Sequence, residues 1–158
     1  MNTMTSEKNS STQMTTRMVE SLNQVLADSY ALLGLTHLAH WNVEGANFFG
    51  LHKAFEEQYQ ELFEAVDEIA ERVRAIGGYA VGGLHRLASM AGIEEFTPPL
   101  AQKDYVAALV TAHEKLLQDA IQARETAGQV NDLESQDLMI GRITHHEKTL
   151  WMLKSFLK

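Results

Sequence analysis

The strongest structural signal in the sequence is a run of apolar residues between positions 51 and 76. They recur in alternating steps of three and four residues, which is the spacing of one face of an α-helix. This stripe consists of Leu51, Phe55, Tyr59, Leu62, Val66, Ile69, Val73 and Ile76. Gly77 and Gly78 follow it, and glycine commonly ends a helix. A helix with such an apolar face must bury it against other helices, so we expect a helical bundle.

Three further segments have helical spacing of apolar residues. We predict a first helix over residues 16–40, a third from about Lys103 to Gly128, and a fourth that opens at a capping-box pattern from Asn131 to Glu134. A short extra helix is expected over residues 82–90, and the polar residues 1–15 are expected to be a flexible N-terminal tail. The predicted fold is all-α: an antiparallel four-helix bundle over residues 16–158, with a short extra helix in the connection between helices two and three.

Composition narrows the classes of function. The chain has no cysteine, which excludes disulfide frameworks, thiolate metal sites and cysteine nucleophiles. Its 158 residues include 13 basic and 21 acidic side chains, a formal net charge of −8, and such a charge opposes tight binding to nucleic acid. No apolar run approaches the roughly 20 residues of a membrane span, and the start lacks a signal-peptide pattern. We therefore expect a cytoplasmic protein with no membrane partner.

Helix two also carries four side chains of metal-binding types, arranged as two pairs. The pairs are His52 with Glu56 and Asp67 with Glu71, and their spacing of four residues puts each pair on one face of the helix. At about 100° per residue this face lies roughly 110° to 120° from the apolar stripe. Charged residues in that position are usually only a solvated helix face. A mixed imidazole and carboxylate set would instead suit iron, manganese or zinc, without choosing among them.

A single copy of this helix cannot bring both pairs to one metal ion. Their midpoints are about 15 residues apart, which is roughly 22 Å along a helix, whereas a ligand atom lies about 2 Å from its metal. Two copies packed antiparallel about a twofold axis place one pair opposite the other and create two equivalent sites. Phe63 and Ala70 lie on the same arc and would supply apolar contacts. No Glu or Asp stands three residues before any histidine, so a di-iron site in the core of one bundle is not expected.

The segment from His37 to Gly78, HLAHWNVEGANFFGLHKAFEEQYQELFEAVDEIAERVRAIGG, closely resembles the signature region of the Dps family, the miniature ferritins. The matching positions are His40-Trp41-Asn42, Gly45, Phe48, Leu51-His52, Asp67 and Ala70-Glu71-Arg72, with Glu147-Lys148 and Trp151-Met152-Leu153 near the end of the chain. The resemblance implies a ferritin-like subunit of a hollow dodecamer built from twofold dimers. Such assemblies oxidise Fe²⁺, preferably with hydrogen peroxide, and store the ferric mineral.

The resemblance also implies a ligand set shared across the twofold interface. One subunit would supply His40, His52 and Glu56, and its neighbour Asp67 and Glu71. Glu56 stands where many members of the family have Asp, and it keeps the carboxylate. These five residues would be both the catalytic and the metal-binding residues, with iron as Fe²⁺ and Fe³⁺ and with zinc or manganese as competitors.

Several other residues have two interpretations. His37 is a candidate for a supporting position beside the metal or for a weaker ligand, but it is better explained as an ordinary surface or interface histidine. Trp41 is a candidate electron donor to a stray oxidant, and it is at least as well explained as a packed interface aromatic. Asp132, Glu134 and Asp137 match the region that forms the acidic threefold pores of the family. Alternatively, these three acids only stabilise the N-terminus of a helix, where negative charge is favourable.

The remaining candidates carry less information. Three glutamates of helix two are candidates for the cavity face, where they would nucleate mineral: Glu57, Glu61 and Glu64. No constellation unites the other histidines, which are expected to be structural: His85, His113, His145 and His146.

Direct DNA binding is expected to be weak or absent. The tail has Lys8 against Glu7 and the chain ends with Lys154 and Lys158, whereas DNA-binding members often use lysine-rich tails. Twelve subunits of net charge −8 would also repel the phosphate backbone. DNA would then be protected chemically, by removal of iron and peroxide. The alternative function is a nucleoid-associated DNA-packing or scaffold protein with a vestigial metal site.

Overall fold

The computed structural model of the chain describes residues 3–158, with side chains from Thr12 onward. Over these residues it has five α-helices and no β-strand. The helices are α1 (Thr3–Asn42), α2 (Phe48–Ala75), α3 (Leu84–Met90), α4 (Gln102–Gln129) and α5 (Leu133–Phe156). Within the described part of the chain, no helix is both long enough and apolar enough to span a membrane.

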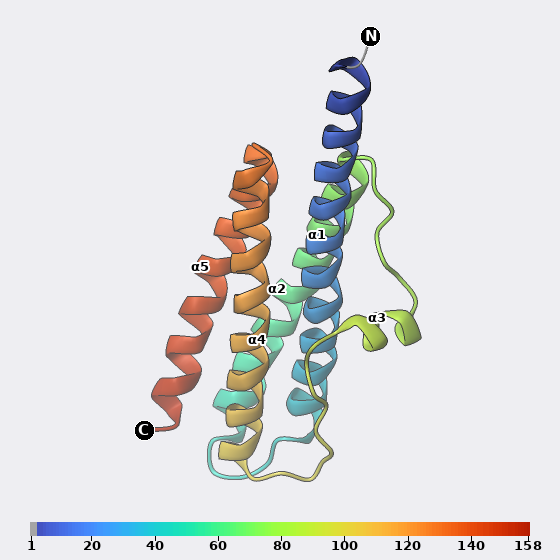
Figure 1. Ribbon diagram of the computed structural model, residues 1–158. Helices are drawn as coiled ribbons and strands as arrows, with labels where there is room; N and C mark the ends of the chain where they lie inside the picture. Colours follow the sequence, from blue (N-terminus) through green and yellow to red (C-terminus); the bar gives the residue numbers. More distant parts are fainter. Residues whose placement is uncertain (1–2) are drawn as a thin grey trace.

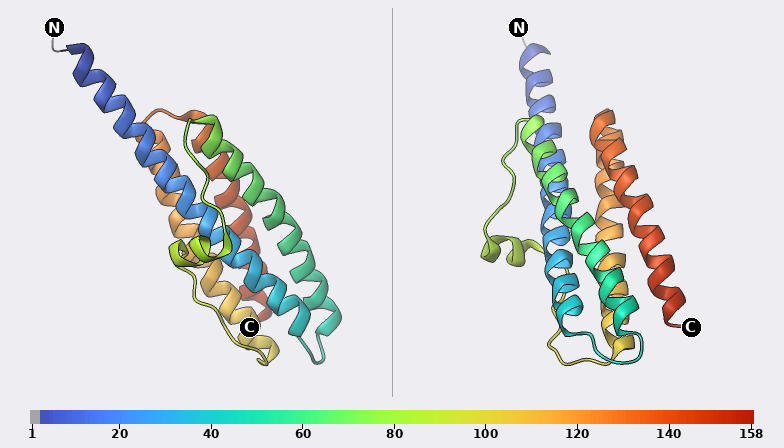
Figure 2. Two further views of the ribbon diagram at one scale, coloured as in Figure 1. Left: turned by 90° about the vertical axis from the view of Figure 1, so that its right-hand side faces the viewer. Right: turned by 180° about the vertical axis from the view of Figure 1, so that it is seen from behind.

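The four long helices form a bundle (Figure 1). α1 and α5 run in one direction, and α2 and α4 run in the other. α1 packs against α2 and α4, and α4 packs against α5, so each of these contacts joins antiparallel neighbours. The connection from α2 to α4 returns along the length of the bundle, and its helix α3 packs against α1 (Figure 2). This arrangement confirms the predicted four-helix bundle with a short extra helix, and one long crossover is typical of the ferritin-like fold.

The apolar stripes of the long helices meet in the core of the bundle. Phe55 of α2, Tyr105 of α4 and Met139 of α5 have no exposed surface. Of the stripe predicted for α2, only Tyr59 and Ile76 are half-buried, and the other members are buried. Removal of this apolar surface from water is the main term that stabilises such a bundle.

The start of α1 lies earlier than predicted. The helix begins at Thr3 rather than near Thr16, so residues 3–15, which were predicted to be a flexible tail, are helical in the structure. This part of α1 extends past the ends of the other helices (Figure 1). It contains neither glycine nor proline, and nothing in its sequence stops a helix that continues from the packed part. The predicted tail also includes residues 1–2, which lie outside the described residues.

The capping residue of the last helix was also predicted one position too early. Asp132, not Asn131, caps α5, because its side chain accepts a hydrogen bond from the N–H of Ser135 at 3.1 Å. Asn131 instead has a φ of 57° in the turn after α4, a conformation that asparagine adopts more readily than most residues. Asn131 therefore takes the left-handed position in the turn, and Asp132 caps the helix.

The end of α2 lies very close to α1. A Cβ atom added at Gly78 would come within 2.5 Å of Val19 Cγ2, closer than carbon atoms pack in proteins. The N–H of Gly78 also donates to the carbonyl of Val73 at 2.9 Å. Glycine at this position therefore allows the long connection to leave α2 against the side of α1.

Asp28 of α1 fastens the chain after α3 to the bundle. Its side chain has no exposed surface. It accepts hydrogen bonds from the N–H of Gly92 at 2.7 Å and from Gln24 Nε2 at 3.2 Å, and Lys115 Nζ lies 3.9 Å from Oδ2. Burial, and secondly a hydrogen bond shared with Asp119 of α4, raise the pKa of Asp28 to about 6.

Candidate metal centre

Two of the candidate ligands, His40 and His52, face each other across the turn between α1 and α2. Nδ1 of His40 lies 2.8 Å from the carbonyl oxygen of His52, and Nδ1 of His52 lies 2.9 Å from the carbonyl oxygen of His40. The two rings stack with their centroids 3.7 Å apart. The end of α1 and the start of α2 are thus joined by a pair of reciprocal hydrogen bonds.

These bonds determine where each neutral imidazole carries its proton. A carbonyl oxygen can only accept a hydrogen bond, so Nδ1 must be the donor in both residues. A neutral imidazole has a single N–H, and Nε2 of His40 and of His52 is therefore left with a free lone pair. Metal-binding histidines are commonly oriented in this way, with one ring nitrogen bonded to a carbonyl and the other facing the metal.

Glu56 lies one turn after His52, and its carboxylate is paired with an ammonium group. Lys53 Nζ is 3.0 Å from Glu56 Oε2. The hydrogen bond from Lys53 and the charge of Lys53 lower the pKa of Glu56. Glu56 is therefore ionised near neutral pH, as a metal ligand must be, and a metal ion would compete with Lys53 for it.

His37 and Trp41 lie beside the reciprocal histidine pair. The ring of His37 stacks on that of Trp41, with centroids 5.1 Å apart and an interplanar angle of 6°. It also contacts Tyr59 at 4.1 Å. Burial, and then the neighbouring His40, lower the pKa of His37. Trp41 is 68% exposed, so this tryptophan is available to a partner molecule; the supporting roles of both residues stay predictions.

The second pair of candidate ligands, Asp67 and Glu71, is exposed on α2. Asp67 lines a groove of about 760 Å³ between α2 and α3, together with the apolar Phe63, Ala70 and Leu84. Among the described residues, no group of three or more His, Asp or Glu side chains gathers within one chain. The two pairs of candidate ligands therefore form no single group within one chain, and the sharing of ligands between subunits stays a prediction.

Apolar surface lies beside each of the two groups of candidate ligands. A second groove, of about 670 Å³, runs between α1 and α3 and is lined by Tyr30, Leu38, Trp41 and Leu84. Tyr30 and Leu84 also line the groove beside Asp67, so the two grooves flank α3 on one face of the subunit. Trp41 and Leu84 are 68% and 81% exposed. We name this surface of α1, α2 and α3 the apolar face.

The acids proposed for a pore begin α5. Asp132 is bound to Arg72 Nη2 at 2.5 Å as well as capping the helix. Burial alone would raise the pKa of Asp132, but its hydrogen bonds to Ser135 and Arg72 lower it. Glu134 and Asp137 are exposed. The helix-terminus interpretation thus holds for Asp132, and a pore role for the three acids stays a prediction.

A chain of buried polar side chains that the sequence did not reveal crosses the bundle between α2, α5 and α4. Arg142 forms an ion pair with Glu61 and lies 3.1 Å from His146 Nε2. Arginine only donates, so His146 must donate through Nδ1 to Nδ1 of His113, 2.9 Å away. His113 then carries its proton on Nε2, which is buried without a partner. Burial lowers the pKa of His113 to about 3, so this chain is neutral at the histidines.

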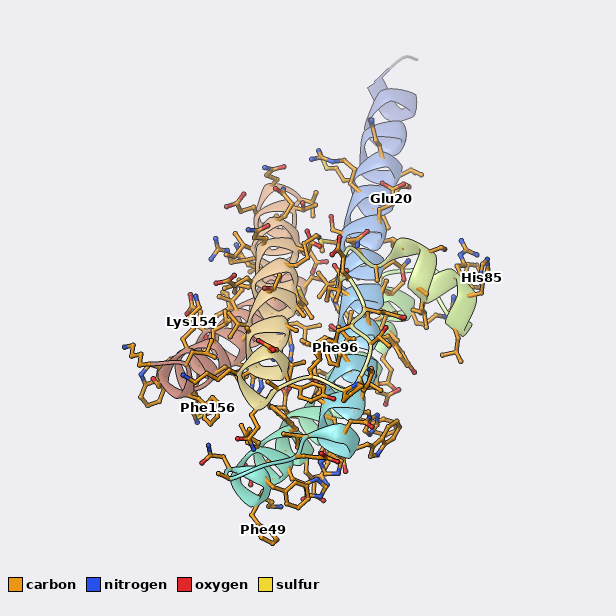
Figure 3. The ribbon with its side chains drawn as sticks, turned by 90° about the horizontal axis from the view of Figure 1, so that it is seen from below. Glu20, Phe49, His85, Phe96, Lys154 and Phe156 are labelled. Carbon is orange, nitrogen blue, oxygen red and sulfur yellow. The ribbon has the colours of Figure 1, made fainter. Side chains whose placement is uncertain are left out.

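The other sequence candidates lie apart from the reciprocal pair. His145 Nε2 is 3.1 Å from Glu61 Oε2, so the carboxylate of Glu61 is already engaged. Glu64 lines the groove beside Asp67, whereas Glu57 lines a different groove between α2 and α5. His85 is exposed on α3, far from Phe49 at the start of α2 (Figure 3). The contacts of His113, His145 and His146 are consistent with the expected structural role of these three histidines.

Comparisons with known proteins agree with this architecture. Residues 19–158 match the family model of the ferritin-like domain. The chain is 36% identical to DNA protection during starvation protein 2 of Bacillus anthracis, over 91% of this chain and 99% of that protein. Among solved structures, a Dps protein from Bacillus brevis superposes with a TM-score of 0.90 at 33% identity, covering 92% of this chain and 98% of that one. A Dps protein from Vibrio cholerae, described as a ferritin-like diiron-carboxylate protein, superposes with a TM-score of 0.90 at 31% identity, covering 93% and 92%.

Proposed function

Because this chain belongs to the Dps family of ferritin-like proteins, we propose that it is a ferroxidase that oxidises Fe²⁺, stores the ferric product and so protects DNA. The name of the Bacillus anthracis relative supports the role in DNA protection, and the description of the Vibrio cholerae protein supports iron chemistry. Within this role we propose hydrogen peroxide as the preferred oxidant and a hollow dodecamer in the cytoplasm as the store.

The observation that carries the proposal is the pair of reciprocal hydrogen bonds at His40 and His52. It leaves the Nε2 lone pair of each imidazole free, and the ionised carboxylate of Glu56 lies one turn further along α2. Two imidazoles and a carboxylate are a donor set that binds Fe²⁺, and the added negative charge favours Fe³⁺. Zinc and manganese accept the same donors and would compete.

We propose that Asp67 and Glu71 of a second subunit complete the site. The two halves of one chain are too far apart to meet, as the helical rise requires. The apolar face supports the pairing, because its grooves run beside both halves and carry exposed Trp41 and Leu84. Exposed apolar surface of this kind marks a protein interface. A twofold axis through it would bring each half of one subunit to the opposite half of its neighbour.

The chemistry follows from holding two irons in one site. Each Fe²⁺ gives one electron to hydrogen peroxide, which takes up two protons and becomes two water molecules. Because the two electrons arrive together, no hydroxyl radical is released. The formal charge of −8 per chain favours the approach of iron cations and opposes the phosphate backbone. We therefore propose that DNA is protected by the removal of iron and peroxide, with direct DNA binding weak or absent.

Iron oxidation tests the proposal directly. Fe²⁺ is added without oxygen, peroxide follows, and the ferric absorbance is recorded. The parent protein and an exposed control on α5, Glu147→Gln, should give the same rapid rise. His52→Ala and Asp67→Asn should each lose most of it while remaining assembled by gel filtration. A parent protein that binds DNA tightly and oxidises no iron would favour the scaffold function instead.

Mixing the two inactive variants tests whether the site is shared. When His52→Ala and Asp67→Asn chains are unfolded, mixed equally and refolded, half of the twofold dimers contain one chain of each kind. In such a dimer one site carries both substitutions and the other carries neither. About one quarter of all sites should then be intact, with about one quarter of the parent rate. A mixture as inactive as its components would show that the ligands do not come from two subunits.

A further inference from the structure

The reciprocal histidine pair lies inside a continuous column of aromatic rings that contact one another in turn. On one side Phe48 stacks on His52, with ring centroids 5.0 Å apart and an interplanar angle of 28°. On the other side Tyr59 meets His40 at 5.1 Å and 79°, an edge-to-face contact. Beyond Tyr59 the column continues through His37, at 4.1 Å, to Trp41. Each candidate imidazole ligand therefore contacts a carbon ring as well as the other imidazole.

The column restrains the tilt of each imidazole ring, which the hydrogen bonds alone do not. A single N–H bond from Nδ1 fixes one point of each ring but leaves the imidazole free to tilt about that point. Rings in edge-to-face and offset-stacked contact resist such a tilt, because it would separate surfaces that attract each other. Both neighbours are also half-buried, so they are themselves held by the fold. The direction of each Nε2 lone pair thus depends on the ring beside it.

We propose that Tyr59 and Phe48 are positioning residues, which hold His40 and His52 between them with both Nε2 atoms directed at the metal. Neither side chain would touch the metal. Tyr59 belongs by spacing to the apolar stripe of α2, yet it is only half-buried and its ring is placed against histidines. The inference rests on the proposed function, because it concerns how the same ligands are held.

Cobalt binding tests the positioning role without any turnover. Co²⁺ is titrated into the assembled, iron-free protein, and the visible absorption band reports the geometry around the ion. Tyr59→Phe keeps the ring and should match the parent in dissociation constant and spectrum. Tyr59→Leu and Phe48→Leu remove a ring and should each weaken binding about tenfold, with a changed band. Tyr79→Leu is the matched control, because Tyr79 is 83% exposed and lies outside the column.

The outcomes separate this inference from the function on which it rests. Tyr59→Leu with the dissociation constant and spectrum of the parent would overturn the positioning role and leave the ferroxidase proposal standing. A parent protein without a His52-dependent cobalt band would overturn both. Should Tyr59→Leu not assemble, Phe48→Leu decides, since it tests the ring beside the other imidazole of the same pair. Tyr59→Phe as weak as Tyr59→Leu would show that the hydroxyl, not the ring, matters, and would also contradict the proposal.

Discussion

Replacing Asp28 by asparagine is expected to change how the stability of the protein depends on pH. The carboxyl group has an ordinary pKa of 3.8 and a pKa of about 6 in the folded protein. A folded-state pKa that is raised means that the folded protein holds the proton more tightly than the unfolded chain. The stabilising effect of this proton is complete below pH 3.8 and is lost as the pH rises through 6.

The magnitude follows from the shift. Two pKa units correspond to about 3 kcal/mol of lost stability above pH 7. Between pH 5 and pH 7.5 alone, linkage gives a loss of about 1.4 kcal/mol from this one group. Asparagine resembles the protonated acid: its oxygen can accept from Gly92 and its amide can donate to Asp119. The variant loses the attraction of Lys115 and one acceptor for Gln24. Its free energy of unfolding at pH 7.5 should therefore exceed that of the parent by less than about 3 kcal/mol.

Urea unfolding of the iron-free protein at one protein concentration, at pH 5 and at pH 7.5, measures the effect. The difference in unfolding free energy between Asp28→Asn and the parent should shift in favour of the variant by about 1.4 kcal/mol between the two pH values. Asp104→Asn, an exposed change on α4, should keep the parent's pH dependence. Parallel curves for the parent and Asp28→Asn would refute the assignment of a raised pKa to this buried carboxyl group.

Two further changes test the packing. Arg142→Leu leaves Glu61 without its cation at a mostly buried position and should cost about 3 kcal/mol in urea unfolding; no loss would mean that the ion pair does not stabilise the bundle. Gly78→Ala forces Val19 aside and should lower the stability by about 1–3 kcal/mol. Gly141→Ala should instead raise the stability by about 0.5–1 kcal/mol, because no atom lies within 4 Å of the added Cβ on this helix. A melting temperature for Gly78→Ala at or above that of the parent would contradict the close approach of α2 to α1.

The sequence predicts α2 closely and α1 less well, for physical reasons. The predicted stripe over residues 51–76 corresponds to a helix from Phe48 to Ala75, because one buried face repeated over many turns allows a single interpretation. The start of α1 has no such constraint. Its first turns extend past the ends of the other helices, so only weak intrinsic propensities indicate where the helix begins. The same weakness explains the cap at Asp132, since either of two adjacent polar residues can satisfy the pattern.

The candidate site could be predicted in its residue types but not in its hydrogen bonds. The spacing of His52 and Glu56 indicates a shared helix face, and the resemblance adds His40. Nothing in the sequence indicates that His40 and His52 would each bond the other's carbonyl group, because this contact depends on how two helices cross. The chain from Arg142 through His146 to His113 could be predicted only in part: Arg142 and His146 lie four residues apart on α5, but Glu61 and His113 come from other helices.

The turn between α1 and α2 spans only residues 43–47. The hydrogen bonds of His40 and His52 join the two helices on either side of it. Each ring holds the other's main chain, so neither can be released alone. One residue inserted between the start of α2 and His52 would rotate His52 by about 100° around the helix axis and break both hydrogen bonds at once. The number of residues between His40 and His52 is therefore constrained by both rings, whereas the carboxylate of Glu56 further along α2 takes no part in this contact.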